Sequence, residues 1–224
     1  MRILLTDPSR FDNPTLPMSK KHPAGIFITF EGTEGSGKST LIKHLAQALE
    51  NRGQRVACTR EPGGTSVSEK IRDILLHHPM NSWTELLLYE AARAEHLTHT
   101  ILPALEQGSI VLCDRFTDST LAYQGYARKL PWKQIQALNR IATLGIKPHL
   151  TVFLDIDPET GLRRAQDANR FEAEGIHFQK KVRLGYLKAR QENPKKWFSI
   201  KVDRKTPEQL TEIVVKECVR RFKI

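Results

Sequence analysis

The chain has 224 residues, of which 39% are apolar and 27% are charged, and its formal net charge at pH 7 is +10. This composition is ordinary for a globular protein, and it excludes a low-complexity or repetitive chain. The length suffices for one domain with a full core. The positive charge favours an anionic partner, either nucleotide or nucleic acid, with a solvated basic surface as the alternative.

Three cysteines, Cys58, Cys113 and Cys218, are widely spaced and lack the spacing of metal ligands. Two of them lie in apparent buried strands, so we expect small core residues of a reducing compartment. No apolar run has the length of a membrane span, and no signal peptide is visible. We therefore expect a cytoplasmic protein.

Residues 1–23 contain four prolines and little periodicity, which predicts a disordered N-terminal extension. Met18, followed by Ser-Lys-Lys, is an alternative start of the chain. Residues 24–224 are expected to form a single domain.

A glycine-rich loop follows the first predicted strand. Ile-Phe-Ile-Thr-Phe at 26–30 indicates a buried strand, and apolar residues at helical spacing occupy 41–49. Between them, Gly-Thr-Glu-Gly-Ser-Gly-Lys-Ser at 32–39 matches G-x-x-x-x-G-K-[ST], the phosphate-binding P-loop. Strand, glycine loop and helix form the setting that this motif requires.

The P-loop predicts a site for ATP. Its glycines let backbone N–H groups surround an anion, and the helix N-terminus adds positive potential. Lys38 would reach the β and γ phosphates, and the hydroxyl of Ser39 would ligate Mg²⁺. The alternative is a flexible glycine turn that binds nothing. The residues expected to bind ATP are Gly32, Thr33, Glu34, Gly35, Ser36, Gly37, Lys38, Ser39 and Thr40.

The remaining elements alternate along the chain. Strands are predicted at 55–59, 109–113, 150–154 and 197–202. Helices are predicted from about residue 66, over 83–106, and after a Thr-Pro-Glu-Gln cap at 206–209. We expect Pro103 to kink or end the long helix. Strands separated by helices predict an α/β, three-layer P-loop fold, with a five-stranded parallel sheet flanked by helices on both faces.

A second stretch with chemistry begins where the third strand ends. Asp114 is placed to hold Mg²⁺ or its water, and Arg115 to bind phosphate oxygens in bidentate fashion. The alternatives are a helix cap for Asp114 and, for Arg115, an ion pair with Asp114 itself.

Four motifs occur in one order along the chain. They are Phe-Glu-Gly-x-Glu-Gly-x-Gly-Lys at 30–38, Glu-Pro-Gly-Gly-Thr at 61–65, Asp-Arg-Phe-x-x-Ser-Thr-x-Ala-Tyr-Gln-Gly at 114–125, and Leu-Asp-Ile-Asp-Pro at 154–158. Together they resemble the bacterial thymidylate kinases, within the P-loop nucleoside monophosphate kinases. The resemblance covers about residues 25–224. It implies phosphorylation of dTMP to dTDP by MgATP, for dTTP synthesis.

The resemblance also assigns the acceptor site. Glu34 is similar to the carboxylate that accepts from the sugar 3′-hydroxyl, with a solvent-facing loop acid as the alternative. Tyr89 takes the place of an aromatic that stacks on thymine, although an apolar helix equally favours a core aromatic there. Arg93, one turn later, matches the arginine that donates to a base carbonyl. The dTMP-binding residues that the resemblance implies are Glu34, Arg60, Arg72, Tyr89, Arg93, Arg115, Ser119, Thr120, Tyr123 and Gln124.

The family's lid is short in this sequence. Residues 161–165 and 169–172 resemble its two ends, which predicts a lid near 161–174, and only five residues separate Arg164 from Arg170. Lids exclude water and bring positive charge to the transferring phosphoryl group. Either arginine, or both, would act there, with exposed helix ion pairs as the alternative. The expected catalytic residues are Lys38, Arg115, Arg164 and Arg170, and the expected metal ligands are Ser39 and Asp114.

The partners that follow are ATP and dTMP, with a homodimer implied by the resemblance and no membrane or nucleic acid. Two other functions stay open at this point. The chain could be another P-loop kinase that acts on a nucleoside or on a different nucleoside monophosphate. A nucleoside acceptor would need a general base, for which Glu31 or Glu61 are candidates. A P-loop ATPase that binds nucleic acid would use the positive charge, but no basic, aromatic-interleaved patch appears.

Overall fold

The structure of the chain is a computed structural model that describes residues 24–164 and 174–224. The predicted N-terminal extension, residues 1–23, lies outside the described residues, as does most of the predicted lid.

All five predicted strands pair in one parallel sheet in the order β2-β3-β1-β4-β5. The three central strands are apolar and buried on both faces, as strands are that carry helices on either side. The predicted five-stranded parallel sheet is therefore confirmed. The strands are β1 (Ile26–Glu31), β2 (Val56–Arg60), β3 (Ile110–Asp114), β4 (Leu150–Asp155) and β5 (Trp197–Lys201).

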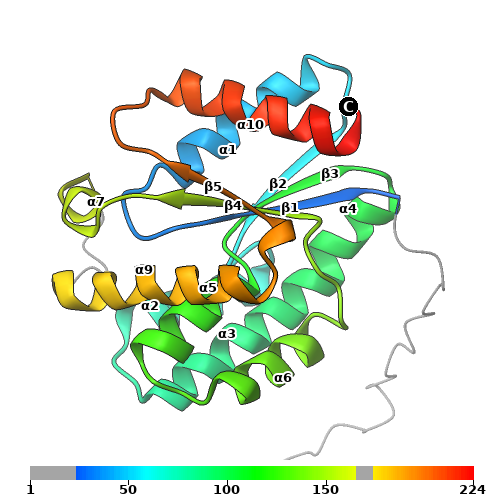
Figure 1. Cartoon of the computed structure of the whole chain (residues 1–224). Coiled ribbons are helices and arrows are strands. Elements are labelled where there is room, and N and C mark those ends of the chain that lie inside the picture. Colours follow the sequence, from blue (N-terminus) through cyan, green and yellow to red (C-terminus); the bar gives the residue numbers. More distant parts are fainter. Residues whose placement is uncertain (1–23, 165–173) are drawn as a thin grey trace, which may run out of the picture.

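Helices cover both faces of the sheet (Figure 1). On one face α1 (Lys38–Glu50) and α10 (Pro207–Phe222) pack on each other and on the sheet, around Ile28, Leu45 and Val214. The other face carries two apolar clusters. They are built with α3 (Ser82–His96), α4 (Leu102–Glu106), α6 (Trp132–Ala142), α9 (Gly175–Glu192) and the π-helical segments η2 (Leu97–Ile101) and η3 (Leu121–Ala127).

Shorter elements complete the fold. Helix α2 (Ser66–His77) packs on α3, and α5 (Thr117–Thr120), α7 (Pro158–Arg164) and the 3₁₀ turn η4 (Pro194–Lys196) lie in connections. The predicted cap of α10 is a full capping box between Thr206 and Gln209. No helix within residues 24–164 and 174–224 is long and apolar enough to cross a membrane.

The structure refines two sequence expectations. The helix does not end at Pro103: the chain widens to a π-helix over η2 and continues through Pro103, in the first turn of α4, to Glu106. The wider turn precedes the proline, and a proline in the first turn of a helix lacks only an N–H that needs no partner there. Cys58 is exposed rather than buried, because β2 is an edge strand. Cys113 is buried as expected, and Cys218, on α10, is buried as well.

The topology gathers the motifs at one edge of the sheet. The P-loop follows β1, Glu61-Pro62 follows β2, and Asp114-Arg115 stands at the end of β3. These three strands are neighbours, and ligands of open α/β sheets bind at the carboxyl ends of the strands.

Helix α9 approaches this edge unusually closely. A Cβ built on Gly185 would lie 2.7 Å from the Cα of Ala122, so only glycine lets α9 pack directly on the backbone of η3. The close approach brings the next residue, Tyr186, which is fully buried, to the end of β3.

Candidate active site

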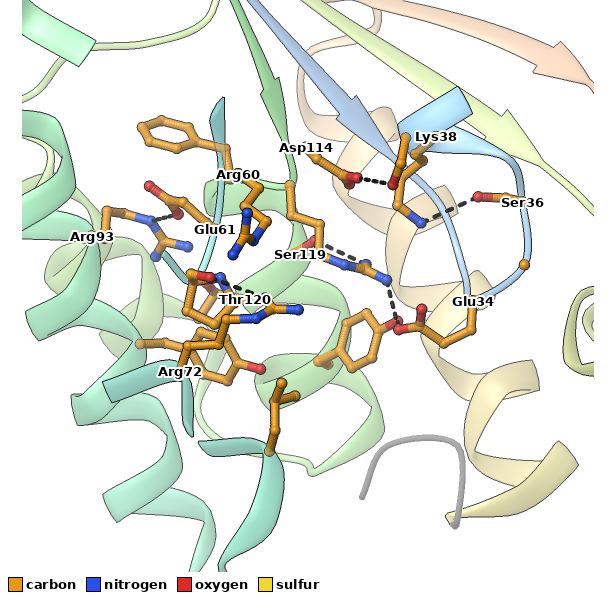
Figure 2. A pocket seen from close by; sticks show the side chains of 18 of the residues that line it. Glu34, Ser36, Lys38, Arg60, Glu61, Arg72, Arg93, Asp114, Ser119 and Thr120 are labelled. Atoms are coloured by element: carbon orange, nitrogen blue, oxygen red, sulfur yellow. Dashed lines mark hydrogen bonds and ion pairs between the residues drawn. The ribbon is translucent and has the colours of Figure 1, made fainter. Parts of the chain in front are cut away.

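A pocket of about 560 Å³ opens at the carboxyl ends of β1, β2 and β3. In Figure 2, Glu34, Ser36 and Lys38 lie on one side of it and Arg60, Arg72 and Arg93 on the other. The structure thus brings together nearly all the site residues expected from the sequence. The expected residues that line the pocket are Glu34, Gly35, Ser36, Gly37, Lys38, Ser39, Thr40, Arg60, Arg72, Tyr89, Arg93, Asp114, Arg115, Ser119, Thr120, Tyr123, Gln124 and Arg164.

Three expected residues are not among the residues that line the pocket. The carbonyls of Gly32 and Thr33 accept from Lys38, which does line the pocket. Arg170 lies outside the described residues.

The P-loop has the backbone that its sequence predicts. Gly35 and Gly37 adopt φ of 67° and 87°, a region that L side chains rarely enter, and α1 begins directly after Gly37. Lys38 donates from Nζ to the carbonyls of Gly32 and Thr33, at 3.1 and 3.0 Å. Burial lowers the pKa of Lys38, although Asp114 and Glu34 nearby favour its charged form. The loop therefore carries a desolvated cation beside a helix N-terminus.

Ser39 and Asp114 form the pair expected to hold a metal. The Ser39 hydroxyl donates to Oδ2 of Asp114 at 2.8 Å. Oδ1 of Asp114 is buried and has no hydrogen-bond partner among the described residues. A carboxylate with an unused oxygen beside a hydroxyl fits Mg²⁺, which prefers oxygen ligands and takes only one or two from the protein when phosphates supply others.

Arg115 connects the two sides of the pocket. Its backbone has a φ of 70°, a left-handed conformation that is rare outside glycine and clusters at functional sites. Its Nη2 forms a 2.6 Å ion pair with Glu34, and its Nη1 donates to the carbonyl of Gly32 at 3.1 Å. Burial opposes the charge of Arg115, but Glu34 and neighbouring hydroxyls raise its pKa well above the usual value. The pairing with Asp114 considered from the sequence is not formed.

Glu34 is a paired carboxylate at the mouth of the P-loop. It accepts from Arg115 and, at 3.2 Å, from the Tyr123 hydroxyl. Burial favours its neutral form, but Arg115 and Lys38 outweigh burial and lower its pKa. A solvent-facing loop acid is therefore not what the structure contains. The surrounding cations explain how a carboxylate is tolerated where anionic phosphates are expected.

Arg60 and Arg72 stand opposite the P-loop (Figure 2). Nη2 of Arg60 contacts both carboxylate oxygens of Glu69, at 3.0 and 2.9 Å, and Arg72 donates to the carbonyl of Pro62 at 3.0 Å. Burial and the charge of Arg60 lower the pKa of Arg72. An anion bound beside Arg72 would therefore favour its charged form.

Arg93 is buried, with 2% of its surface exposed, and is held by three side chains. Nε donates to Glu61 at 2.8 Å, and Nη1 donates to Glu90 and Asn139 at 2.9 and 2.7 Å. Burial disfavours its charge, but Glu61 and Glu90 raise its pKa above the usual value. Among the described residues no partner engages Nη2, so this nitrogen is the one left for a ligand.

The aromatic and polar residues expected around a base lie on the same side. Tyr89 is half-buried: it lines the pocket, and it also packs on a core cluster as the alternative interpretation expects. Oγ1 of Thr120 is buried without a partner in the described part of the chain, and the Gln124 amide donates to Glu85. Ser119 differs from expectation: its hydroxyl donates to Glu31 at 2.6 Å and so serves the scaffold as well as the pocket.

Sequence reasoning missed Tyr186 and did not predict the structural role of Glu31. Tyr186 bonds to Arg115 Nη1 at 3.1 Å and to the Ser119 hydroxyl at 2.8 Å, and nothing in its helical context indicates this. Glu31 accepts from the Phe116 N–H as well as from Ser119. Its signal was visible, because an acid that ends an apolar strand must be paired when the strand is buried.

Glu31 predicts a specific pH dependence of stability. Burial, helped by Asp118, raises its pKa from 4.5 to about 7, against the hydrogen bonds that favour its charge. The folded protein therefore holds this proton more tightly than the unfolded chain. Stability from this group is present below pH 4.5 and is lost as pH rises through 7, by roughly 2–3 kcal/mol.

Urea unfolding at pH 5 and pH 8 measures this effect. The unfolding free energy of wild type minus that of Glu31→Gln is expected to fall by this amount between the two pH values. Glu106→Gln, at an exposed carboxylate on α4, is the control and leaves the difference unchanged. A pH-independent difference for Glu31→Gln would show that Glu31 is ionised throughout.

Comparisons with known proteins agree with this geometry. The sequence model of the family described as thymidylate kinase matches residues 30–213. The chain is 53% identical over 171 residues to a thymidylate kinase of Bacillus cytotoxicus, covering 73% of this chain and 82% of that protein. It is 46% identical over 198 residues to one of Bacillus mycoides, covering 85% and 95%.

A solved structure gives the same result at the level of the fold. The crystal structure of thymidylate kinase from Ehrlichia chaffeensis matches with a TM-score of 0.74 and 34% identity, over 87% of this chain and 99% of that one. Motifs, sheet topology, pocket and relatives all agree, and the chain belongs to the thymidylate kinase family.

Proposed function

We propose that this chain transfers the γ-phosphoryl group of ATP, with Mg²⁺, to dTMP and releases ADP and dTDP. The observation that carries the proposal is Arg115. It contacts the P-loop at Gly32 and Glu34 while facing the pocket that also holds Arg60 and Arg72. One guanidinium thus lies between a donor site and a second anion site. The chain is accordingly an ATP:dTMP phosphotransferase of nucleotide biosynthesis.

The donor half binds ATP. The P-loop N–H groups and Lys38 surround the β and γ phosphates. Ser39 and Asp114 would hold Mg²⁺, which when bound neutralises charge on the same phosphates. Arg164, at the end of α7, lines the pocket and adds positive charge toward the transferring group. Arg170 is proposed for the same role from the sequence alone.

The acceptor half binds the phosphate of dTMP through Arg60, Arg72 and Arg115. An oxygen of this phosphate attacks the γ-phosphorus, the bond to the oxygen bridging to the β-phosphate breaks, and that oxygen leaves with ADP. The attacking group is already anionic at neutral pH, so the step needs charge neutralisation and alignment rather than a strong base.

The thymidine part lies between the arginines and the P-loop. We propose that Tyr89 stacks on the base, Arg93 donates to a base carbonyl, and Thr120 and Gln124 face the base edge, with Ser119 beside them. Tyr123 packs against the sugar, and Glu34 accepts from its 3′-hydroxyl. The contact between Glu34 and the Tyr123 hydroxyl supports a shared role for them beside the sugar.

The site argues against a nucleoside acceptor. Glu31 is fully buried, engaged by Phe116 and Ser119, and does not line the pocket. Glu61 lines the pocket but is paired with Arg93 and His96. Neither is available as a base, and a nucleoside would leave Arg60, Arg72 and Arg115 without an anionic ligand to bind. The same arginines give the positive charge a use without nucleic acid, which we do not expect as a partner.

We further propose a homodimer. Helices α2 and α3 pack on each other and expose Val67, Ile74, Trp83 and Leu87, with 41 to 53% of each exposed. The resemblance implies a homodimer, and a second copy of the chain is the partner that we propose for this surface. Cytoplasmic residence and the division into one domain with a lid near 161–174 stay predictions.

A panel of acceptors tests the reaction. With ATP and Mg²⁺, a coupled assay of ADP release is expected to give its highest kcat/KM with dTMP, well above dCMP, CMP or AMP. Thymine and uracil differ only by a methyl group, so the preference for dTMP over dUMP is expected to be about 10-fold. No preference for dTMP over any of these would contradict the assignment of the acceptor.

Arg72→Ala tests the acceptor-phosphate site. Loss of a charge-assisted hydrogen bond to the phosphate is expected to raise the KM for dTMP about 10- to 100-fold, with the KM for ATP nearly unchanged. Lys70→Ala is the control, because Lys70 lies on the same helix, carries the same charge and does not line the pocket. Equal effects on both substrates would place Arg72 elsewhere in the reaction.

Leu87→Glu tests the dimer surface. Burying a charge in an apolar interface is unfavourable, so sedimentation velocity is expected to show a dimer for wild type and a monomer for the variant. Leu184→Glu, at a similarly exposed leucine on α9, is expected to leave the dimer intact. A monomeric wild type, or a dimer that survives Leu87→Glu, would exclude this surface.

A further inference from the structure

One wall of the pocket contains a side-chain amide, and a residue outside the pocket fixes its orientation. Gln124, on η3, lines the pocket yet has only 1% of its surface exposed. Its Nε2 donates to Oε1 of Glu85 at 2.7 Å. Glu85 lies in the first turn of α3, is fully buried and does not line the pocket. It therefore touches the amide from the side away from the pocket.

Glu85 is held as a carboxylate by a second partner. Arg128 donates from Nε to the same Glu85 oxygen at 3.0 Å and pairs through Nη2 with Glu174 at 2.6 Å. The pKa of Arg128 is raised, against burial, by its bonds to Glu85 and Glu174, so its charge is secure. A carboxylate paired with a guanidinium has only acceptor atoms.

The carboxylate of Glu85 determines which atom of the Gln124 amide faces the pocket. A glutamine amide has one donor group and one acceptor, and it rotates to suit its neighbours. Because Glu85 accepts only, the NH₂ group must face Glu85, and Oε1 is the atom that remains for a ligand in the pocket. We propose that Glu85 is a positioning residue that fixes Gln124 with its carbonyl toward the base, so that the site selects a pyrimidine with a proton on N3.

The orientation of the Gln124 amide would distinguish thymine and uracil from cytosine. Thymine and uracil carry a hydrogen on N3 and a carbonyl at C4, whereas cytosine carries a lone pair on N3 and an amino group at C4. Oε1 of Gln124 attracts the first pattern and repels the second. Arg93, a donor only, acts in the same sense at the C4 substituent. A site whose buried polar groups are mismatched rejects a ligand strongly.

Glu85→Gln tests the proposal, which rests on the proposed function. A glutamine at 85 offers either a donor or an acceptor, so Gln124 can present either of its atoms to the base. The ratio of kcat/KM for dTMP to that for dCMP is expected to fall about 10-fold or more. Glu174→Gln is the matched control: it removes the other carboxylate on Arg128 without touching Gln124, and the ratio is expected to stay within about twofold.

The outcomes separate three cases. A Glu85→Gln enzyme that keeps the wild-type ratio, or that loses activity toward both nucleotides equally, overturns the positioning role and leaves the proposed function intact. Gln124→Met with an unchanged ratio removes Gln124 from base recognition and overturns the proposal through that step. A wild-type enzyme inactive with dTMP contradicts the proposed function itself.

A measurement on the wild-type protein keeps the proposal testable should Glu85→Gln fail to fold. The side-chain ¹⁵N–H₂ signal of Gln124, assigned by its absence in Gln124→Met, is expected to exchange slowly with solvent before and after dTMP is added, because one hydrogen is bound to a buried carboxylate. Fast exchange without nucleotide, with slowing only when dTMP binds, would mean that the base and not Glu85 orients the amide.

Discussion

The ion pair between Arg115 and Glu34 is the contact on which the site depends. It joins the P-loop, which follows β1, to the end of β3, and both residues are largely removed from solvent. Each would be unfavourable there alone, because an unpaired charge loses most of its hydration on burial. Together they keep a cation at the point where two anionic phosphates would meet. Tyr186 and the carbonyl of Gly32 hold the other end of the same guanidinium, so its direction is set before a substrate arrives.

Other buried ionisable groups near the pocket are also satisfied by fixed partners. Arg93 is enclosed by Glu61 and Glu90, and Asp118 is paired with Lys196. Glu31 is satisfied by an N–H and a hydroxyl. Such pairs add little net stability, because desolvation offsets their attraction, but removing one partner is costly. These contacts therefore fix the positions of the charged side chains around the pocket. A preorganised set of dipoles and charges stabilises a charged transition state without rearranging during the reaction.

The sequence predicted what depends on neighbours along the chain. Strand and helix patterns predicted the sheet, and the four residues Thr-Pro-Glu-Gln at 206–209 predicted the capping box. The P-loop is a local motif whose glycines determine its backbone conformation. Prediction from the sequence failed where the position of a residue depends on contacts with distant parts of the chain. Cys58 has a strand pattern, but the edge position that exposes it is set by the order of the strands. Tyr186 lies 71 residues from Arg115, and only the glycine contact of α9 with η3 brings it there. The resemblance to a family supplied most acceptor residues, since no local pattern marks Arg60 or Gln124.

Donor binding can be predicted from a local motif, whereas acceptor recognition depends on contacts between distant segments. Donor binding relies on one loop whose backbone N–H groups treat any nucleoside triphosphate alike, so a short motif suffices to encode it. Acceptor recognition must distinguish bases that differ in the direction of a hydrogen bond. A side chain can enforce that direction only if a second side chain fixes its rotation, and this requires contacts among α3, η3 and the residues that follow it. Specificity is therefore built from tertiary contacts such as Gln124 to Glu85. A motif can reveal that a chain binds phosphate, but the arrangement behind the pocket wall determines which nucleotide it accepts.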